Sequence, residues 1–493
     1  MIVKNSSLSV DTEKLRKKIL DLAMRGKLIP QDSQDEPASV LLEKIKEEKA
    51  QLIKEKKIKK SKPLPEITEE EKPFEIPESW EWVRLGEICN YIQRGRSPKY
   101  SKEDTGFKII SQKCIRWNDI NLEYAKSITK DFFEKLENYR FIKKEDILWC
   151  STGTGTVGRL NISKRDLKNI PVDSHVTLVR GNDNLNRKFL YYYLLSPIIQ
   201  NNMDKLLTGT TKQKELGLLS VQKILIPLPP LAEQKRIVAK VEECMQAIKM
   251  IEDSSKEYEK LQNQLDKKVL DLAMRGKLVP QDNQDEPASV LLEKIKEEKA
   301  QLIKEKKIKK SKPLPEITDE EKLFEIPESW EWVRLGDVVK PQIKIKPNYK
   351  FKYVDIASID NKRNYIKSPK IIDPSIDKIP SRANQLINSK DIVFSMVRPY
   401  LKNIAIVDEE FDNQIASSGF YILKLYKQLS PGYVFTILIS DKFITTVTKF
   451  MKGDNSPSIR KGDLENSIIP LPPLAEQKRI VAKIEEIKQY LEI

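Results

Sequence analysis

The sequence has little of what most catalytic and metal-binding sites require. It contains one histidine, His175, and four cysteines, which all lie in the first half at wide and irregular spacing. Without a companion ligand, His175 is expected to be a packed or hydrogen-bonded residue. The cysteines have no counterparts in the second half, which excludes a duplicated zinc or disulfide framework. No G-x-x-x-x-G-K-[ST] loop for phosphate binding occurs.

The chain also lacks long apolar segments. No apolar run approaches the length of a membrane span. The first residues lack the charged start and apolar middle of a secretion signal. We therefore expect a cytoplasmic protein with no membrane partner.

Two short motifs invite a catalytic interpretation that their context does not support. Residues 153–158 match G-x-G-x-x-G after a predicted strand, but no evident helix or suitably placed acidic residue follows, so we do not expect a nucleotide site. The Glu-Gln-Lys triplets at 233–235 and 476–478 echo part of a nuclease site. They lie in a predicted first helical turn and lack a partnering carboxylate strand, so capping is the preferred interpretation. No Asn-Pro-Pro-Tyr-type tetrapeptide that grips a flipped adenine is present.

What the chain does contain is a long internal repeat. Residues 20–86 return as residues 270–336 with four differences: Ile29/Val279, Ser33/Asn283, Glu69/Asp319 and Pro73/Leu323. A second passage, 226–240, returns as 469–483. We call these repeated passages the frames.

The stretches that the frames enclose, roughly 87–225 and 337–468, do not align with each other beyond their borders. We call them the inserts. Near-identical frames around dissimilar inserts indicate one surface presented twice to the same partner and two surfaces that differ. That organisation is typical of an adaptor that reads two different targets.

The net charge of +15 favours a polyanionic partner. Residues 54–62 contain six lysines and one glutamate, and their copy at 304–312 doubles this contribution. A lysine run beside Pro63-Leu-Pro65 is more often a solvated linker than a binding site. The overall charge therefore supports nucleic acid only modestly.

A four–three spacing of apolar residues follows the second repeated passage. It runs from Ile237 to Leu272 and predicts a helical coiled-coil seam of roughly 50 Å. The prolines of residues 227–230 mark its start, and Gly276 and Pro280 mark its end. A second helix is expected after Pro37.

The other copy of this seam is divided between the two ends of the chain. Residues 480–491 repeat its start, and residues 8–22 repeat its end. We therefore expect the termini to lie side by side and to close the molecule into a pseudo-twofold circular arrangement. Trp80 and Trp82 are two positions apart in an extended stretch. We expect them to lock the first insert onto the predicted helix of residues 237–272 rather than to stack on bases, because both frames carry the same pair while the inserts differ.

The inserts read as mixed α/β. The strands predicted for the first insert are 147–150 and 172–179, and those for the second are 354–356, 391–395 and 419–424. Periodicity does not decide between helix and strand for 187–195 and 434–451.

Polar and basic clusters within the inserts suit contacts to phosphates and base edges, because small residues permit close approach while arginine and glutamine read purine edges. The candidates in the first insert are Arg94, Arg96, Lys99, Thr152, Thr154, Thr156, Arg159, Lys212, Gln213 and Lys214. Those in the second insert are Arg398, Lys402, Ser456, Ser458, Arg460 and Lys461. Such loops are also ordinary turns, and their joint occurrence in both inserts favours DNA contact.

Across essentially its whole length, the sequence resembles the specificity (S) subunit of type I restriction–modification enzymes. The signature Pro-Leu-Pro-Pro-Leu-Ala-Glu-Gln-Lys-Arg-Ile-Val occurs twice, each time ending an insert and opening a helix. The family-like passages Leu-Ala-Met-Arg-Gly-Lys-Leu (22–28, 272–278) and Ile-Pro-Glu-Ser-Trp-Glu-Trp (76–82, 326–332) also occur twice.

The inserts resemble the family less evenly. The family's Gly-x-Thr-Pro turn matches residues 95–98, with Ser97 in place of threonine, whereas residues 340–344 of the second insert have no such turn. The second insert is similar to the family at 394–400 and 417–420.

The resemblance implies an α+β fold with two mixed α/β target-recognition domains, joined by two long antiparallel helical coiled-coil connectors. Each domain would read one half of a bipartite site on double-stranded DNA, and the connectors would set the spacer and dock two methyltransferase (M) subunits. The partners would carry S-adenosylmethionine, ATP and Mg²⁺, with restriction (R) subunits added, so this chain would bind no cofactor and be non-catalytic.

The expected segments are an N-terminal helical connector half (1–75), a first target-recognition domain (76–225), a central helical connector (226–325), a second target-recognition domain (326–468) and a C-terminal connector helix packed against the N-terminal helix (469–493). Two alternatives stay open. One is a non-enzymatic coiled-coil DNA-binding scaffold outside restriction–modification, and the other is a stand-alone nuclease or methyltransferase.

Overall fold

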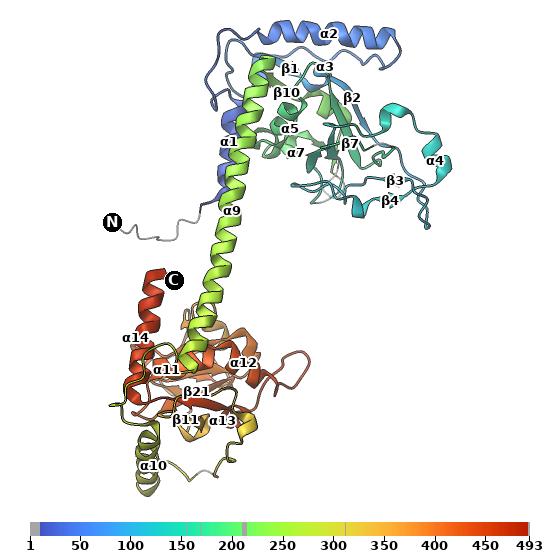
Figure 1. Ribbon diagram of the computed structural model, residues 1–493. Coiled ribbons are helices and arrows are strands. Elements are labelled where there is room, and N and C mark those ends of the chain that lie inside the picture. The colour runs from blue at the N-terminus through green and yellow to red at the C-terminus, as the bar shows by residue number, and fades with distance from the viewer. Residues whose placement is uncertain (1–9, 154, 168, 210–213, 311, 492–493) are drawn as a thin grey trace. The chain divides into compact units, whose positions relative to one another are not determined.

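The computed structural model describes residues 10–153, 155–167, 169–209, 214–310 and 312–491 (Figure 1). The described residues form two compact units, one of residues 10–255 and the other of residues 256–491. The division falls inside the longest helix, α9 (Leu231–Met274). Each unit holds one frame and one recognition domain.

The frame of the first unit consists of three helices, a two-stranded sheet and the start of α9. Its elements are α1 (Thr12–Met24), α2 (Ala38–Lys54), β1 (Glu81–Arg84), α3 (Leu85–Ile88) and β10 (Leu225–Leu228), with β1 and β10 antiparallel. The side chain of Asp11 caps α1. Helix α2 begins directly after Pro37, as predicted, and buries Ala38, Leu41 and Ile45.

The frame of the second unit repeats these elements. It consists of the end of α9, α10 (Ala288–Lys304), β11 (Glu331–Arg334) paired antiparallel with β22 (Ile468–Leu471), and α14 (Leu474–Leu491). The predicted helix from 237 to 272 is confirmed by α9, which begins after Pro230 and ends just before Gly276. Its pairing into a coiled coil and the circular arrangement remain predictions.

The first recognition domain is built on a four-stranded antiparallel sheet. Its strands are β2 (Cys89–Arg94), β5 (Ile147–Cys150), β6 (Leu160–Ile162) and β7 (Val176–Gly181), in the spatial order β2-β7-β5-β6. The smaller elements are β3 (Lys108–Ile109), β4 (Lys126–Ser127), α4 (Lys130–Glu134), α6 (Pro197–Gln200), α7 (Met203–Leu206), β8 (Leu207–Thr208), β9 (Glu215–Leu216) and α8 (Leu218–Lys223).

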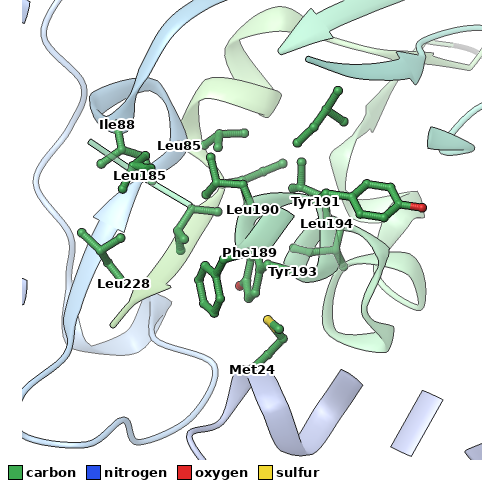
Figure 2. Close-up of a cluster of buried hydrophobic side chains, with 14 of the residues drawn as sticks. Met24, Leu85, Ile88, Leu185, Phe189, Leu190, Tyr191, Tyr193, Leu194 and Leu228 are labelled. Carbon is green, nitrogen blue, oxygen red and sulfur yellow. The ribbon is translucent and has the colours of Figure 1, made fainter. Parts of the chain in front are cut away.

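Helix α5 (Arg187–Leu195) joins this domain to its frame. Figure 2 shows its side chains Phe189, Leu190 and Tyr193 beside Leu85, Leu228 and Met24, all buried in one core cluster. Because Met24 belongs to α1 and Leu228 to β10, the cluster ties frame and insert together. The segment that periodicity left undecided is thus a helix.

The second recognition domain contains a sheet of the same order. Strands β12 (Val339–Lys340), β18 (Ile392–Ser395), β19 (Ile404–Ile406) and β21 (Phe420–Leu425) follow the order β12-β21-β18-β19. A second sheet, β16-β13-β20-β17, comprises β13 (Phe351–Val354), β16 (Lys370–Ile372), β17 (Ala383–Ile387) and β20 (Gln414–Ser417). The remaining elements are β14 (Ile359–Asp360), β15 (Tyr365–Ile366), α11 (Pro431–Ile439), α12 (Asp441–Thr448) and α13 (Lys461–Glu465).

A buried ion pair occupies the same place in both sheets. Asp146, directly before β5, accepts from the Arg180 guanidinium of β7 over 2.6 Å. Asp391, directly before β18, pairs with Lys424 of β21. The two inserts, which do not align by sequence, therefore share one core fold.

Two predicted strands had wrong bounds, and the segment 434–451, which periodicity left undecided, is helical. The strand expected at 172–179 begins at Val176, because Asp173 forms a turn by accepting the backbone N–H of His175. The strand expected at 354–356 is β13, which ends at Val354 before a 3-10 turn. Residues 434–451 fall across two helices, α11 and α12, separated at Ser440, whose hydroxyl caps the second.

Candidate nucleic-acid interface

In the first domain, two loops that carry predicted DNA-contacting residues lie side by side. One is the loop between β5 and β6, described at residues 151–153 and 155–159, and the other is formed by β8 and β9, described at residues 207–209 and 214–216. The backbone N–H of Leu216 donates to the carbonyl of Ser151 over 2.8 Å, and Thr152 forms an isolated bridge with Glu215. We call these two segments the first loop pair.

The second domain has its own loop pair at the equivalent position. It consists of the loop between β18 and β19, residues 396–403, and residues 452–459. The backbone N–H of Ile459 donates to Met396 over 3.0 Å, and that of Arg398 donates to Pro457 over 2.8 Å. The candidates in these loops come from two inserts that do not align, yet the loops follow equivalent strands of the two sheets.

Three of the predicted residues in the first domain are turned toward the protein. Arg94 donates to Glu215 over 2.9 Å and to the carbonyl of Leu216 over 2.8 Å. Arg159 donates to the carbonyl of Gln112 over 2.8 Å, and the Thr156 hydroxyl donates to the Gln112 side chain over 3.0 Å. These bonds hold the loop pair in shape, while the buried Nε atoms of Arg94 and Arg159 have no hydrogen-bond partner among the described residues.

Other predicted residues present polar groups at the surface. Arg96 is exposed and pairs with Glu137 over 2.9 Å, and Lys99 is exposed. The Thr152 hydroxyl lies 2.7 Å from Nδ1 of His175, so the lone histidine is hydrogen-bonded at this edge as expected. Lys214 pairs with Asp204 over 2.6 Å. Thr154, Lys212 and Gln213 lie outside the described residues.

In the second domain, backbone strain marks the loop pair. Arg398 and Lys402 both adopt left-handed backbone conformations, with φ of +48° and +53°. Such conformations cost free energy in residues other than glycine and gather at functional loops. The exposed Arg398 donates to the carbonyl of Asn455 over 2.7 Å, and Lys402 pairs with Asp441 over 2.6 Å.

The remaining candidates of this domain line the other half of the loop pair. Ser456 is exposed and Ser458 is half-buried in a bridge with Val397. Arg460 is exposed at the start of α13, and Lys461 lies 3.3 Å from Glu465. The structure therefore brings all six predicted residues of the second insert to one region.

Sequence reasoning missed an aromatic surface in the first domain. Tyr100, Trp117 and Tyr124 are all largely exposed, and the cations of Lys126 and Arg116 lie over the rings of Tyr100 and Tyr124. Burial, followed by the nearby negative charge of Asp173, raises the pKa of Tyr100. The alternation of lysine, arginine and aromatic residues across 113–126 was the available signal.

Each frame is held together by a matching set of hydrogen bonds to a buried glutamate. Buried Glu233 accepts the indole N–H of Trp80 over 2.8 Å and the Gln31 amide over 2.7 Å. Glu476 accepts from Trp330 over 2.8 Å and from Gln281 over 2.5 Å. Trp80 also packs edge-on against Phe189 of α5, with ring centroids 6.3 Å apart, so this tryptophan joins the first insert to α9 as predicted.

The exact placement of these groups differs from two expectations. Trp80 is buried just before β1, whereas Trp82 is half-buried and packs on Phe74 with ring centroids 5.1 Å apart, so the two rings do not share one strand face. Glu233 and Glu476 lie in the first turns of α9 and α14 as predicted, but they are buried and accept from tryptophan and glutamine side chains instead of capping the helices. Burial raises the pKa of both carboxyls against the opposing effect of their donors.

The described residues offer no obvious metal chemistry. Among them, no group of three or more His, Cys, Asp or Glu side chains could hold a metal ion. Cys89, Cys114 and Cys150 are buried free thiols, and burial raises the pKa of Cys89 to about 12. In the part of the chain that the structure describes, no helix has the length and apolar character needed to cross a membrane.

Comparison with known proteins agrees with this geometry. The family model "Type I restriction modification DNA specificity domain" matches residues 77–260 and 327–493. The chain is 33% identical to the type I restriction enzyme EcoAI specificity subunit of Escherichia coli, over 97% of this chain and 89% of that protein. It is also 33% identical to the EcoEI specificity subunit of Escherichia coli, over 66% of this chain and 62% of that protein.

Solved structures show the same fold. The chain resembles the HsdS subunit from Thermoanaerobacter tengcongensis with a TM-score of 0.51 and 21% identity, over 85% of this chain and 92% of that chain. A chain from a structural study of complex assembly and conformational transition in a type I R-M system gives a TM-score of 0.55 and 21% identity, over 85% and 93%. These findings support the main interpretation over the alternative of a scaffold outside restriction–modification. The chain belongs to the family of type I restriction–modification specificity subunits.

Proposed function

We propose that each recognition domain of this chain reads one half of a bipartite sequence in double-stranded DNA. The observation that carries the proposal is the pair of equivalent loop pairs. They follow equivalent strands of the two sheets but carry different side chains, Thr152 with its partner His175 in one domain and Arg398 and Ser458 in the other. Equivalent position with unlike chemistry is what two readers of unlike half-sites require.

The candidate residues fall into two roles under this proposal. Exposed groups such as Arg96, Lys99, Arg398, Ser456 and Arg460 contact phosphates or base edges. Inward-facing groups such as Arg94 and Arg159 position the loops that carry those contacts.

The frames dock two methyltransferase subunits, one on each. Near-identical surfaces suit identical partners. The hydrogen bonds of Glu233 with Trp80 and Gln31 in the first frame recur in the second frame at Glu476. The helical connectors form antiparallel coiled coils in a pseudo-twofold arrangement and set the spacer between half-sites. At ~1.5 Å per residue, the 44 residues of α9 span roughly 66 Å, enough to separate two readers by one ~34 Å turn of DNA.

The chain itself is non-catalytic under this proposal and works in the cytoplasm. Adenine methylation with S-adenosylmethionine belongs to the methyltransferase subunits, and ATP- and Mg²⁺-dependent cleavage belongs to the restriction subunits. A purified complex of one chain with two methyltransferase chains supports this assignment, and a one-to-one complex contradicts it.

Exchange of the first insert tests the reading role. Residues 87–225 are replaced by the corresponding insert of a related specificity subunit, and methylated sites are mapped by sequencing the methylome of cells that express the hybrid. We expect one half-site to change while the other half and the spacer stay the same. A change in both halves, or in neither, would overturn the proposal.

A further inference from the structure

Each recognition domain carries a hairpin that neither the predicted residues nor the loop pairs include. In the first domain it spans residues 114–121, where Ile115 and Ile120 form an antiparallel bridge and Asn121 donates its N–H to Cys114 over 2.8 Å. In the second domain it spans residues 359–366, where β14 and β15 pair Ile359 with Ile366. Along the chain, the first hairpin lies between β2 and Asp146, and the second lies between β12 and Asp391.

The first hairpin is anchored on its loop pair. Its root residue Gln112 accepts bonds from Arg159 and Thr156 of the loop between β5 and β6. The side chain of Asn161 on β6 donates to the carbonyl of Arg116 over 2.8 Å. Cys114 and Ile115 are fully buried beneath. The tip is therefore held rigidly beside the predicted DNA-contacting loop.

The second hairpin touches its own loop pair in a similar way. The amide of Asn361 donates to the carbonyl of Leu401 over 2.9 Å. The amide of Asn364 donates to the carbonyls of Lys402 and Ile404 over 2.9 and 3.1 Å. The hairpin tips thus extend the edge formed by the loop pairs in both domains.

The chemistry of the two tips is different. The first presents Trp117, which is 53% exposed, beside Arg116 stacked on Tyr124 at 5.1 Å. A large aromatic side chain held in solvent on a rigid turn is typical of a binding contact. The second tip presents the exposed cations Lys362 and Arg363, whose backbone N–H groups each donate to the Asp360 carboxylate of the same hairpin over 3.0 Å.

We propose that the hairpins are a further element of DNA recognition, with Trp117 making an apolar contact to a base of the first half-site and Lys362 and Arg363 contacting phosphates of the second. The proposal rests on the proposed function. DNA fits better than a protein partner, because two identical methyltransferase subunits need like surfaces and the tips are unlike. Aromatic side chains add affinity through base contacts that are insensitive to salt, whereas each neutralised phosphate adds salt dependence.

The test uses the complex of this chain with its methyltransferase subunits and duplexes that carry the site found by methylome sequencing. For Trp117→Ala we expect about tenfold weaker binding, reduced discrimination against base changes in the first half-site only, and an unchanged salt slope. For Lys362→Gln with Arg363→Gln we expect the slope of log K against log salt to fall by about 1.8, since each phosphate contributes about 0.9. Trp117→Phe keeps the apolar contact and serves as the matched control.

Three results would overturn the inference: unchanged binding by Trp117→Ala, equal loss of discrimination in both half-sites, or failure of that variant to assemble with the methyltransferase. The last would identify the tip as a protein contact. If exchange of residues 87–225 alters one half-site while Trp117→Ala has no effect, only the hairpin inference fails. If the exchange itself leaves both half-sites unchanged, the proposed function fails.

Discussion

Trp80 donates to Glu233 in one frame and Trp330 donates to Glu476 in the other, both over 2.8 Å. The frames repeat their hydrogen bonds residue by residue, whereas the recognition domains share a sheet order, one buried ion pair and the positions of a loop pair and a hairpin that carry different side chains. The difference separates two constraints on the same chain. The frames keep their surface side chain by side chain, and the domains keep a scaffold while their edge loops diverge.

The ion pair is the point where the two domains can be compared most directly. Arg180 bonds to Asp146 and also to the carbonyls of Tyr139 and Phe141, over 3.1 and 2.9 Å. Lys424 bonds to Asp391 and to the side chain of Asn388. The planar guanidinium serves more acceptors than the ammonium group, so the same scaffold position carries a larger network in the first domain.

The largest effect is expected from breaking this pair. Asp146→Ala leaves the Arg180 charge buried and unpaired, which should lower the free energy of unfolding of the first unit by about 3–5 kcal/mol. Asp391→Ala should destabilise the second unit on a similar scale. Hydrogen exchange followed by mass spectrometry on peptides from each unit measures the two separately. Loss of protection in both units from a single substitution would show that the domains are not independent.

Glycine substitutions in the frames come next. Gly26 and Gly276 both have φ of +67°, and an added Cβ would lie 2.7 Å from Pro77 and 2.5 Å from Pro327 respectively. Gly26→Ala and Gly276→Ala should each cost about 2–4 kcal/mol, from the left-handed backbone and from overpacking. The same exchange measurement should give equal losses in the two units. Unequal losses would break the equivalence of the frames.

Removing an indole donor should have a smaller effect. Trp80→Phe and Trp330→Phe keep the ring but leave the buried carboxylates of Glu233 and Glu476 short of one hydrogen bond, at a cost of about 1–3 kcal/mol each. Urea unfolding of the two single variants and the double variant measures the losses. We expect the two losses to be equal and to add, because the sites share no partner.

The smallest effect concerns pH. Burial raises the pKa of Glu233 and Glu476 above its ordinary value of 4.5, so the folded chain binds more protons than the unfolded chain just above that pH. These groups therefore favour the folded state at acid pH, and their contribution is lost as pH rises through the raised pKa. The variant with Glu233→Gln and Glu476→Gln should show a flatter dependence of unfolding free energy on pH in that window. A pH dependence of the unfolding free energy equal to that of the original chain would contradict the raised pKa values of the two carboxyls.

Local patterns in the sequence were sufficient to predict the frames. The four–three spacing identified α9, the proline and glycine signals gave its ends, and the paired tryptophans indicated the lock. These features depend on residues that are near in sequence or are repeated. The bonds of Gln31 and Gln234 could not be foreseen, because their partners lie far along the chain.

The recognition domains were predicted less completely. Their common sheet rests on pairings such as β2 with β7, whose residues lie more than 80 positions apart and share no pattern with the other insert. The candidate list named loops that lie together in each domain, but it did not predict the direction of each side chain. Arg159 and Thr156 turn toward Gln112, and Trp117 was missed because its exposure depends on the hairpin beneath it.

The central claim is that the frames are interchangeable sites that hold unlike readers, and one chimera tests it most directly. Residues 87–225 are replaced by residues 337–468, so that both frames carry the second recognition domain. Sequencing of the methylome should then reveal a symmetric site made of two inverted copies of the second half-site with the original spacer. An asymmetric site that retains the first half-site in a folded, methyltransferase-bound chimera would contradict the account.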